Sequence, residues 1–551
     1  MGVDGPRDLQ AILGGEQAVA KWRVLAFGPV RCENLWVAYD YVSSGRDQLF
    51  LLATSMRDWL DEGHLAWFVI DVVDRVDTTA FHALHPNHGP GRPAYNPEMM
   101  LALLFYAYGT GVRSARRIEA SCRTDAAYRV ICANATPDHA TIARFLVDHE
   151  AAIEAVFVDV LRLCAAAGLV SVGTIAIDGT KIGSDAALDA NRTSEWIRAE
   201  VERILAEAAA TDAVEDAQSA LFDTGGVGEA MSTRAGRLAR LDAAQAEIDA
   251  AAEAARVAAE ERAAAARAEA AEGRRMPGPK PKEPHAALAR AEAELAAAVV
   301  RADARAGQRA ALEAGAAAEG RKLRGPRPGP DRGMARAQAA VDAARAAVDN
   351  AEPVVTQANV TDPQSRIMKT ATGWVQGYNA QAAVNENQIV VACTVTQDHN
   401  DVGQYQPMVA ATLANLAAAG IGEPIGHVLA DAGYWSDTNA TTTGPARLIA
   451  TLKDHKQRRA ARDLGTTTGD PPEAATPLEA MEHRLRTEEG AALYATRGHT
   501  VEPVFSVKEN HGYRRFRRRG LNAATSEWAL IATSHNLGKL FRSQSKPLGV
   551  T

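Results

Sequence analysis

The chain has 551 residues, which is too long for one ordinary domain, so we expect two to four domains. A formal net charge of -8 excludes a uniformly basic nucleic-acid coat but leaves room for local basic patches. Five scattered cysteines without a Cys-x-x-Cys pair exclude a disulfide framework and a cysteine-rich zinc site. The sequence shows neither a bilayer-spanning apolar run nor a signal pattern, so we expect a cytoplasmic protein without a membrane partner.

The first 168 residues divide into two parts. Residues 1–46 have a mixed composition without clean periodicity, and we treat them as an N-terminal extension whose fold the sequence does not predict. Residues 47–168 predict an all-helical domain in which glycine and proline separate short helices. Its arginines, Arg116 and Arg117 among them, could grip DNA phosphates, which makes this domain a DNA-binding candidate. A solvated helical face would explain the same charges equally well.

A change of composition separates residues 193–350 from the rest of the chain. Alanine, glutamate, arginine and aspartate dominate there, interrupted by Pro-Gly-rich segments at residues 276–284 and 324–332. High helix propensity with alanine at the apolar positions predicts long helices joined by stiff linkers and packed as a coiled-coil-like arm. The arm either reaches DNA or a second subunit, or is only a tolerated surface insertion.

Two short apolar strands each deliver an aspartate into a glycine turn. Residues 174–177 are followed by Asp178, and residues 427–430 are followed by Asp431. A carboxylate at the end of a strand either caps the turn or binds a metal ion. For a single copy the cap is the better interpretation, but the second copy favours a metal site.

A third acid, Glu502, lies further along the chain, between Arg497 and Lys508. Hard divalent cations prefer oxygen ligands, so two strand-end aspartates and a later glutamate could form a three-carboxylate site for two such ions.

The remaining pattern predicts an α/β domain. In chain order it comprises a hairpin of strands 373–384 and 389–396, a helix at 404–419, a strand at 447–453, a polar stretch at 454–493, helical character from about 501 and a last helix at 525–540. This order is the one expected of a ribonuclease H-like fold. We therefore predict an α/β protein with a ribonuclease H-like catalytic core (residues 169–192 and 351–545), an N-terminal all-helical domain and the inserted Ala-rich helical arm.

Short motifs along the chain carry a resemblance to a known family. They are Gly91-Arg-Pro-Ala-Tyr-Asn-Pro97, Ser114-Ala-Arg-Arg-Ile-Glu119, Pro137-Asp-His-Ala-Thr-Ile-Ala-Arg-Phe145, Ile177-Asp-Gly-Thr-Lys181, Thr361-Asp-Pro-Gln-Ser-Arg366, Gly377-Tyr-Asn-Ala-Gln381, Ala430-Asp-Ala-Gly-Tyr434, Val501-Glu-Pro-Val-Phe505, Arg519-Gly-Leu521, Glu527-Trp528 and His535-Asn-Leu537. In this order they resemble bacterial insertion-sequence transposases of the DDE type, closest to the IS1182 group within the IS5/IS4-like set.

The resemblance implies that Asp178, Asp431 and Glu502 form a catalytic triad binding two Mg²⁺ or Mn²⁺ ions. One ion would activate water or a DNA 3′-hydroxyl, and the other would stabilise the leaving oxygen. Arg497 and Lys508 would hold the phosphate backbone. The implied function is DNA cleavage and strand transfer at the terminal inverted repeats of an insertion sequence. The implied partners are double-stranded terminal-repeat and target DNA, bound by a homodimer in the cytoplasm at the nucleoid.

Other residues carry secondary hypotheses. Arg514 and Arg515 belong to an Arg-rich stretch that could also contact DNA. Asp362 has either a supporting or a turn-forming role. Glu527 is the rival for the third acid, although its apolar neighbours favour a position flanking the core. The spacing before Lys508 is one residue shorter than is usual in the family, which weakens its assignment.

Two other functions fit the same sequence. A ribonuclease H-like nuclease would have the same metal site but would cut without joining. A non-enzymatic DNA-binding protein, such as a decayed transposase, would keep its acids only as turn caps. Joining of a 3′ end and dependence on a metal ion distinguish these alternatives.

Overall fold

The computed structural model describes most of the chain from residue 55 onward. The described residues are 55–83, 94–215, 233–271, 284–320, 332–349, 357–370, 372–453, 456, 459 and 462–544. The predicted N-terminal extension of residues 1–46 lies outside them, as does most of each Pro-Gly-rich segment of the arm. Within the described part, no helix has the length and apolar character that crossing a membrane requires.

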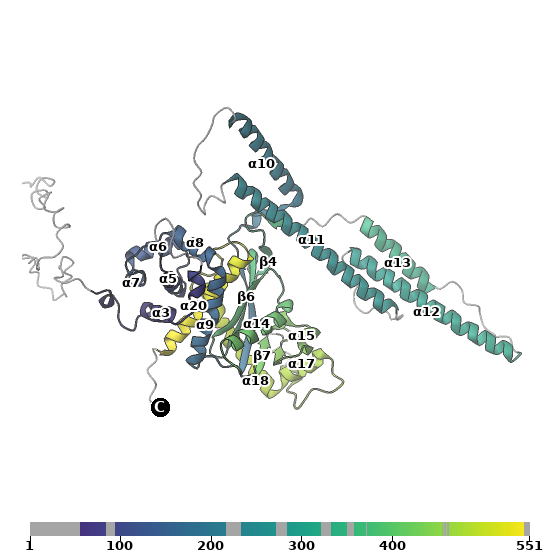
Figure 1. Ribbon diagram of the computed structural model, residues 1–551. Helices are drawn as coiled ribbons and strands as arrows, with labels where there is room; N and C mark the ends of the chain where they lie inside the picture. The colour runs from purple at the N-terminus through teal and green to yellow at the C-terminus, as the bar shows by residue number, and fades with distance from the viewer. Residues whose placement is uncertain are drawn as a thin grey trace, which may run out of the picture.

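Short helices form the N-terminal part of the molecule (Figure 1). They are η1 (Met56–Trp59), α3 (Leu65–Val73), α4 (Thr79–His82), α5 (Pro97–Gly109), α6 (Ala115–Thr124), α7 (Ala126–Ile131), α8 (His139–Asp148) and α9 (Glu150–Ala166). α5 is one of the predicted short helices: the Asn96 side chain accepts a hydrogen bond from the Met99 amide, and Pro97 occupies the first turn. Residues Met100 to Tyr108 of α5 are buried, so this helix forms the centre of the group.

A mixed sheet lies in the second part of the molecule. Its strands are β1 (Thr174–Gly183), β4 (Arg366–Thr370), β5 (Gly373–Asn385), β6 (Val390–Thr396), β7 (His427–Ala430) and β8 (Ala446–Ile449). The order is β4-β5-β1-β7-β8, and β6 also pairs with β5. β1, β7 and β8 run parallel, whereas β5 runs antiparallel to β1, β4 and β6. The chain is therefore a mixed α/β protein, as expected.

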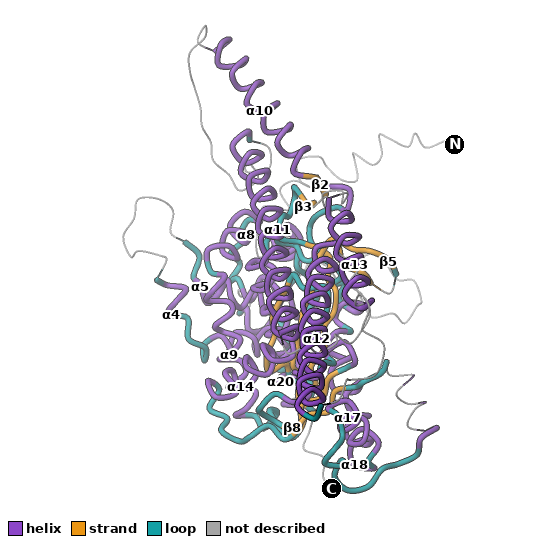
Figure 2. Tube along the Cα trace, turned by 90° about the vertical axis from the view of Figure 1, so that its right-hand side faces the viewer, coloured by secondary structure: helices purple, strands orange, loops and turns teal. Residues whose placement is uncertain are grey.

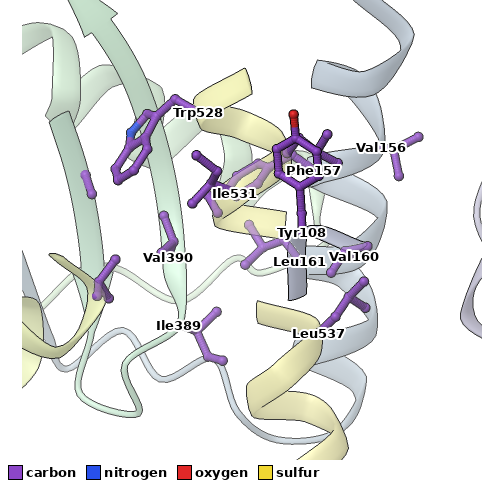
Figure 3. Close-up of a cluster of buried hydrophobic side chains, with 14 of the residues drawn as sticks. Tyr108, Val156, Phe157, Val160, Leu161, Ile389, Val390, Trp528, Ile531 and Leu537 are labelled. Carbon is purple, nitrogen blue, oxygen red and sulfur yellow. The ribbon is translucent and has the colours of Figure 1, made fainter. Parts of the chain in front are cut away.

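The helices of the C-terminal half are η4 (Val402–Gln404), α14 (Tyr405–Ala418), η5 (Ala432–Tyr434), α15 (Asp437–Thr441), α17 (Pro477–Arg486), α18 (Glu488–Phe505), α19 (Val507–Asn510) and α20 (Leu521–Gln544). Among them, α14, α17, α18 and α20 pack against strands of this sheet. α20 lies between α9 and β6, and Figure 3 shows Trp528 and Ile531 of α20 near Phe157 of α9 and Val390 of β6. These side chains are almost fully buried, so α20 joins the helical part to the sheet in one hydrophobic core.

The inserted arm begins after η2 (Leu188–Ala190) and β2 (Asn191–Thr193), and β3 (Gln357–Asn359) follows it. The arm's helices are α10 (Ser194–Glu215), α11 (Arg234–Ala271), α12 (Pro284–Ala318) and α13 (Arg332–Asp349). β2 and β3 pair at its base, and α12 packs on both α11 and α13. Figure 1 shows these helices extending away from the sheet. In the turned view of Figure 2, α10 projects upward and α11, α12 and α13 lie in front of the rest of the molecule.

Several elements differ from the sequence prediction. β4 was not expected, and β8 ends at Ile449 instead of at residue 453. α17 lies in the stretch predicted only to be polar, and α18 begins at Glu488 instead of near residue 501. The Thr487 hydroxyl accepts a hydrogen bond from the Gly490 amide and caps α18. The polar composition of this stretch obscured the helix because much of its first half is exposed.

Candidate active site

Asp178 and Asp431 lie side by side because their strands are paired. β1 and β7 run parallel with Ile177 opposite Ala430. Asp178 is the next residue of β1, and Asp431 directly follows the last residue of β7. The four residues before Asp178 are buried, as are the three residues before Asp431. The strands are thus fixed by apolar burial, and both carboxylates follow at the same edge of the paired segment.

Asp178 is half-buried, and a positively charged side chain contacts it. Its Oδ1 accepts from the Gly179 amide at 2.7 Å, and its Oδ2 accepts from Arg497 Nη1 at 3.0 Å. The pKa of Asp178 is raised to about 6: burial is the largest cause, the Arg497 charge lowers the pKa, and the Asp431 charge raises it. Asp178 therefore pays a desolvation penalty for ionisation that a second cation nearby would relieve.

Asp431 also caps a turn. Its Oδ1 accepts from the Gly433 amide at 2.8 Å at the start of η5. The capping role considered from the sequence is therefore present at this residue. It does not exclude a second role, because a carboxylate has several acceptor positions.

Glu502 lies on α18 with an exposed side chain. It follows Arg497 by five residues, which places the two side chains on different faces of an α-helix. Glu502 Oε1 lies 3.2 Å from the position that a Cβ atom on Gly498 would take, so its carboxylate folds back along the helix. Among the described residues, no three histidine, cysteine, aspartate or glutamate side chains gather closely enough to hold a metal ion. The structure thus brings Asp178 and Asp431 together but not Glu502.

Pro503 lies inside α18, directly after Glu502. Proline has no amide hydrogen, so the carbonyl of His499 one turn earlier loses its helical partner. Gln388 Nε2 donates to that carbonyl at 2.9 Å. Gln388, in the turn before β6, therefore supports α18 next to the predicted third acid.

Two residues that the resemblance assigns to the DNA backbone join α18 and α19 to β1. Arg497 is only 6% exposed and pairs with Asp178. Lys508 Nζ donates to the Thr180 hydroxyl at 3.3 Å and to the Lys181 carbonyl at 2.9 Å. Both cations therefore lie beside the Asp178 strand, and each has contacts to the protein itself.

Glu527, the rival third acid, is 1% exposed and forms a buried ion pair with Arg113 at 3.1 Å. Its other oxygen accepts from the amides of Arg517 and Arg518. Arg113 also donates to the backbone carbonyls of Gly512 and Arg515. These contacts engage both carboxylate oxygens, so Glu527 links the helical part to the core.

The remaining predicted residues fall into two groups. Asp362 is fully buried and accepts from the Tyr378 hydroxyl at 2.8 Å and the Gly520 amide at 3.0 Å, which fits the supporting role. The four surface arginines proposed for DNA are exposed, on α6 and on the segment between α19 and α20. They are Arg116, Arg117, Arg514 and Arg515.

Sequence reasoning did not identify Asp401, which lies beside the same strands. Its Oδ1 accepts from Lys181, Asn379 and Gln381. The latter three residues belong to motifs visible in the sequence, Ile177–Lys181 and Gly377–Gln381. Asp401 itself stands in a polar turn before α14, and no local pattern distinguishes it from its neighbours Asp398 and His399.

Comparison with protein families gives two matches. Residues 54–148 match a family described as Transposase domain (DUF772), and residues 449–541 match one described as Transposase DDE domain. The first match covers the N-terminal helices, and the second runs from the end of β8 into α20. No curated protein and no solved structure matches the chain. The IS1182 group is not resolved by these matches. Together they support a DDE transposase, a kind of DNA-binding protein that generally uses divalent metal ions, and suggest an enzyme that cleaves nucleic acid.

Proposed function

We propose that the protein is an insertion-sequence transposase of the IS1182 type, with a ribonuclease H-like core that cleaves and joins DNA at terminal inverted repeats. The observation that carries this proposal is the pair Asp178 and Asp431, delivered side by side by parallel strands between the two matched segments. The strand order β6-β5-β1-β7-β8, with an antiparallel hairpin beside three parallel strands, supports the ribonuclease H-like core.

The donor set fits hard divalent cations in part. Asp178 and Asp431 offer adjacent carboxylate oxygens, and Asp178 is desolvated enough that a cation would favour its ionised form. Glu502 stands apart from them, so it would complete the set only by turning its exposed side chain away from Gly498. When bound, Mg²⁺ or Mn²⁺ would supply Lewis-acid chemistry at a phosphodiester.

The residues of the chain itself have separable roles in this proposal. Arg497 neutralises Asp178 and holds α18 against β1. Lys508 fixes the start of α19 to the same strand. The exposed Arg116, Arg117 and Arg514 offer guanidinium groups to DNA phosphates on two surfaces of the molecule. Residues 47–168 would be the DNA-binding domain, and a homodimer would hold two element ends.

The test uses the full chain with a labelled duplex carrying the terminal repeat, in Mg²⁺ or Mn²⁺. We expect Asp178→Asn, Asp431→Asn and Glu502→Gln each to abolish cleavage while DNA binding, measured by mobility shift, is retained. Glu488→Gln is the matched control, because Glu488 is an exposed acid in the first turn of the same helix. It should cut like the wild type.

Other outcomes would change the proposal in defined ways. Normal cleavage by Glu502→Gln, with both aspartate variants inactive, would remove Glu502 from the site. Cleavage without joining of the 3′ end to target DNA would favour a nuclease. Wild-type protein that binds the duplex but never cuts it in either metal would indicate a DNA-binding protein only.

A further inference from the structure

Asp401 is held at the sheet by three side chains. It lies in the loop between β6 and η4, and its Oδ1 accepts from Lys181 Nζ at 3.2 Å, Asn379 Nδ2 at 2.7 Å and Gln381 Nε2 at 2.8 Å. Lys181 lies opposite Asn379 in the β1–β5 register, two residues from the pair formed by Gly179 and Gln381. The three donors therefore share one face of the sheet and fix the carboxylate there.

Gly179, the residue after Asp178, creates the space for this carboxylate. The position that a Cβ atom on Gly179 would take lies 2.8 Å from Asp401 Oδ1 and 3.0 Å from Asn379 Oδ1. The first distance is shorter than real Cβ contacts, so any side chain at Gly179 would displace Asp401 or the residues that hold it. Because Gly179 has no side chain, the Asp401 carboxylate can approach β1 at the residue next to Asp178.

The second oxygen of Asp401 faces Asp431. A Cβ atom on Gly433 would lie 3.3 Å from Asp401 Oδ2 and 3.0 Å from Asp431 Oδ1, so the two carboxylates flank the same point. Like charges at such close range repel each other unless a cation lies between or beside them. Lys181 supplies one positive charge, but it contacts the opposite oxygen of Asp401, Oδ1.

Asn379 provides an independent indication of a missing donor. Its side chain is fully buried, and its Oδ1 has no hydrogen-bond partner in the part of the chain that the structure describes. That oxygen faces Gly179, next to Asp178, while the amide nitrogen of the same side chain holds Asp401. Buried acceptors without a partner are rare in native proteins, and a water ligand of a bound cation would satisfy this one.

The hydroxyl of Tyr434 lies within electrostatic range of the same acids. Burial raises the pKa of Tyr434, and the charges of Asp401, Asp178 and Asp431 raise it further. All three aspartates therefore act on one buried group, which donates its hydrogen bond to Gln381.

From these contacts we infer that Asp401 is a further acid of the active site, facing the cation position beside Asp431, with Lys181 as its counter-ion when no cation is bound. The inference rests on the proposed function, because it assumes that Asp178 and Asp431 bind a divalent cation. It goes beyond the Asp178, Asp431 and Glu502 set, since Asp401 approaches Asp431 from the loop before α14.

The experiment is a titration of the full chain with MnCl₂, followed by the rise in thermal unfolding temperature, which reports cation binding without catalysis. We expect Asp401→Asn to raise the Mn²⁺ midpoint about tenfold, the lower end of the range for residues that support metal ligands. Lys181→Met should lower the midpoint, because it removes a positive charge from the cation's surroundings. A purely structural role for the pair would not shift the two midpoints in opposite directions.

Asp398→Asn is the matched control. Asp398 is an exposed acid in the same loop, and its side chain accepts a hydrogen bond from Gln404. An Mn²⁺ midpoint in Asp401→Asn equal to that of Asp398→Asn would overturn the inference, even if Asp178→Asn abolishes binding. Absence of any Mn²⁺ effect on the wild type would instead count against the metal site of the proposed function.

Discussion

The ion pairs of the core and of the arm differ in how far apart in sequence their partners lie. In the core, Arg113 pairs with Glu527 and Arg497 with Asp178, across more than half of the chain. In the arm, most of the ion pairs join residues three or four positions apart on one helix, as Arg256 does with both Glu253 and Glu260. The core pairs depend on the fold, whereas the arm pairs need only a helix.

Burial follows the same division. The core pairs lie among side chains of one large hydrophobic cluster, whereas the arm has a small cluster of its own at its base. That cluster contains Ile197, Ile204, Leu241, Ala244, Ile248 and Ala358. Beyond it the arm helices are largely exposed, so helix propensity stabilises them more than packing does. Charge substitutions should therefore have unequal consequences in the two regions.

The largest effect is expected for Arg113→Met in the core. It leaves Glu527 buried and charged without its guanidinium partner, and breaking such a pair costs about 3–5 kcal/mol. Chemical denaturation followed by tryptophan fluorescence measures the change, with the exposed Arg116→Met as control. Adding Glu527→Gln to Arg113→Met should recover part of the loss. A midpoint for Arg113→Met equal to that of the control would show that the pair does not join the two parts of the core.

The pH dependence of cation binding tests Asp178 within the core. Its pKa of about 6 lies above the ordinary value of 3.8, so the folded protein holds a proton on Asp178 that a cation must displace. The Mn²⁺ midpoint should therefore fall about tenfold per unit as pH rises towards 6, and then level off. Arg497 and Asp431 are the charged groups that act on Asp178, and they set the pH at which the Mn²⁺ midpoint stops falling.

The same shift affects the metal-free protein in the opposite sense. Because the folded pKa exceeds the unfolded one, folding takes up a proton below pH 6, and this contribution to stability is lost as pH rises from about 4 through 6. For the cation-binding prediction, Mn²⁺ midpoints that are constant between pH 5 and 7 would be the contradicting result, because they would show that Asp178 is already ionised there.

The smallest effect is expected for Arg256→Ala in the arm. Its pairs with Glu253 and Glu260 are exposed to water, so their loss should leave the unfolding midpoint unchanged within error. Ala255→Gly, at the neighbouring exposed position, should be more harmful because glycine costs about 1 kcal/mol relative to alanine within a helix. Circular dichroism at 222 nm during heating compares the two. A greater loss from Arg256→Ala would mean that charge pairing, and not propensity, stabilises the arm.

The sequence by itself determined those features that depend on neighbouring residues. The β-branched and apolar runs before Asp178 and Asp431 predict strands, and alanine-rich composition predicts helices for the arm, as the structure has them. The α/β class and the pairing of the 373–384 and 389–396 segments follow from the same local patterns. The capping box of Thr476 and Glu479 that begins α17 is also a local feature, but residues 454–493 were predicted from the sequence only as a polar stretch.

Only the tertiary structure decided which side chains meet. Arg497 reaches Asp178, and Lys508 reaches β1, because α18 and α19 dock on that strand. Asp401 joins the site because the β1–β5 register sets Gly179 opposite Gln381 and leaves space there. Such contacts depend on strand register and helix docking, which are fixed by burial of residues far apart in the chain, and no local pattern encodes them.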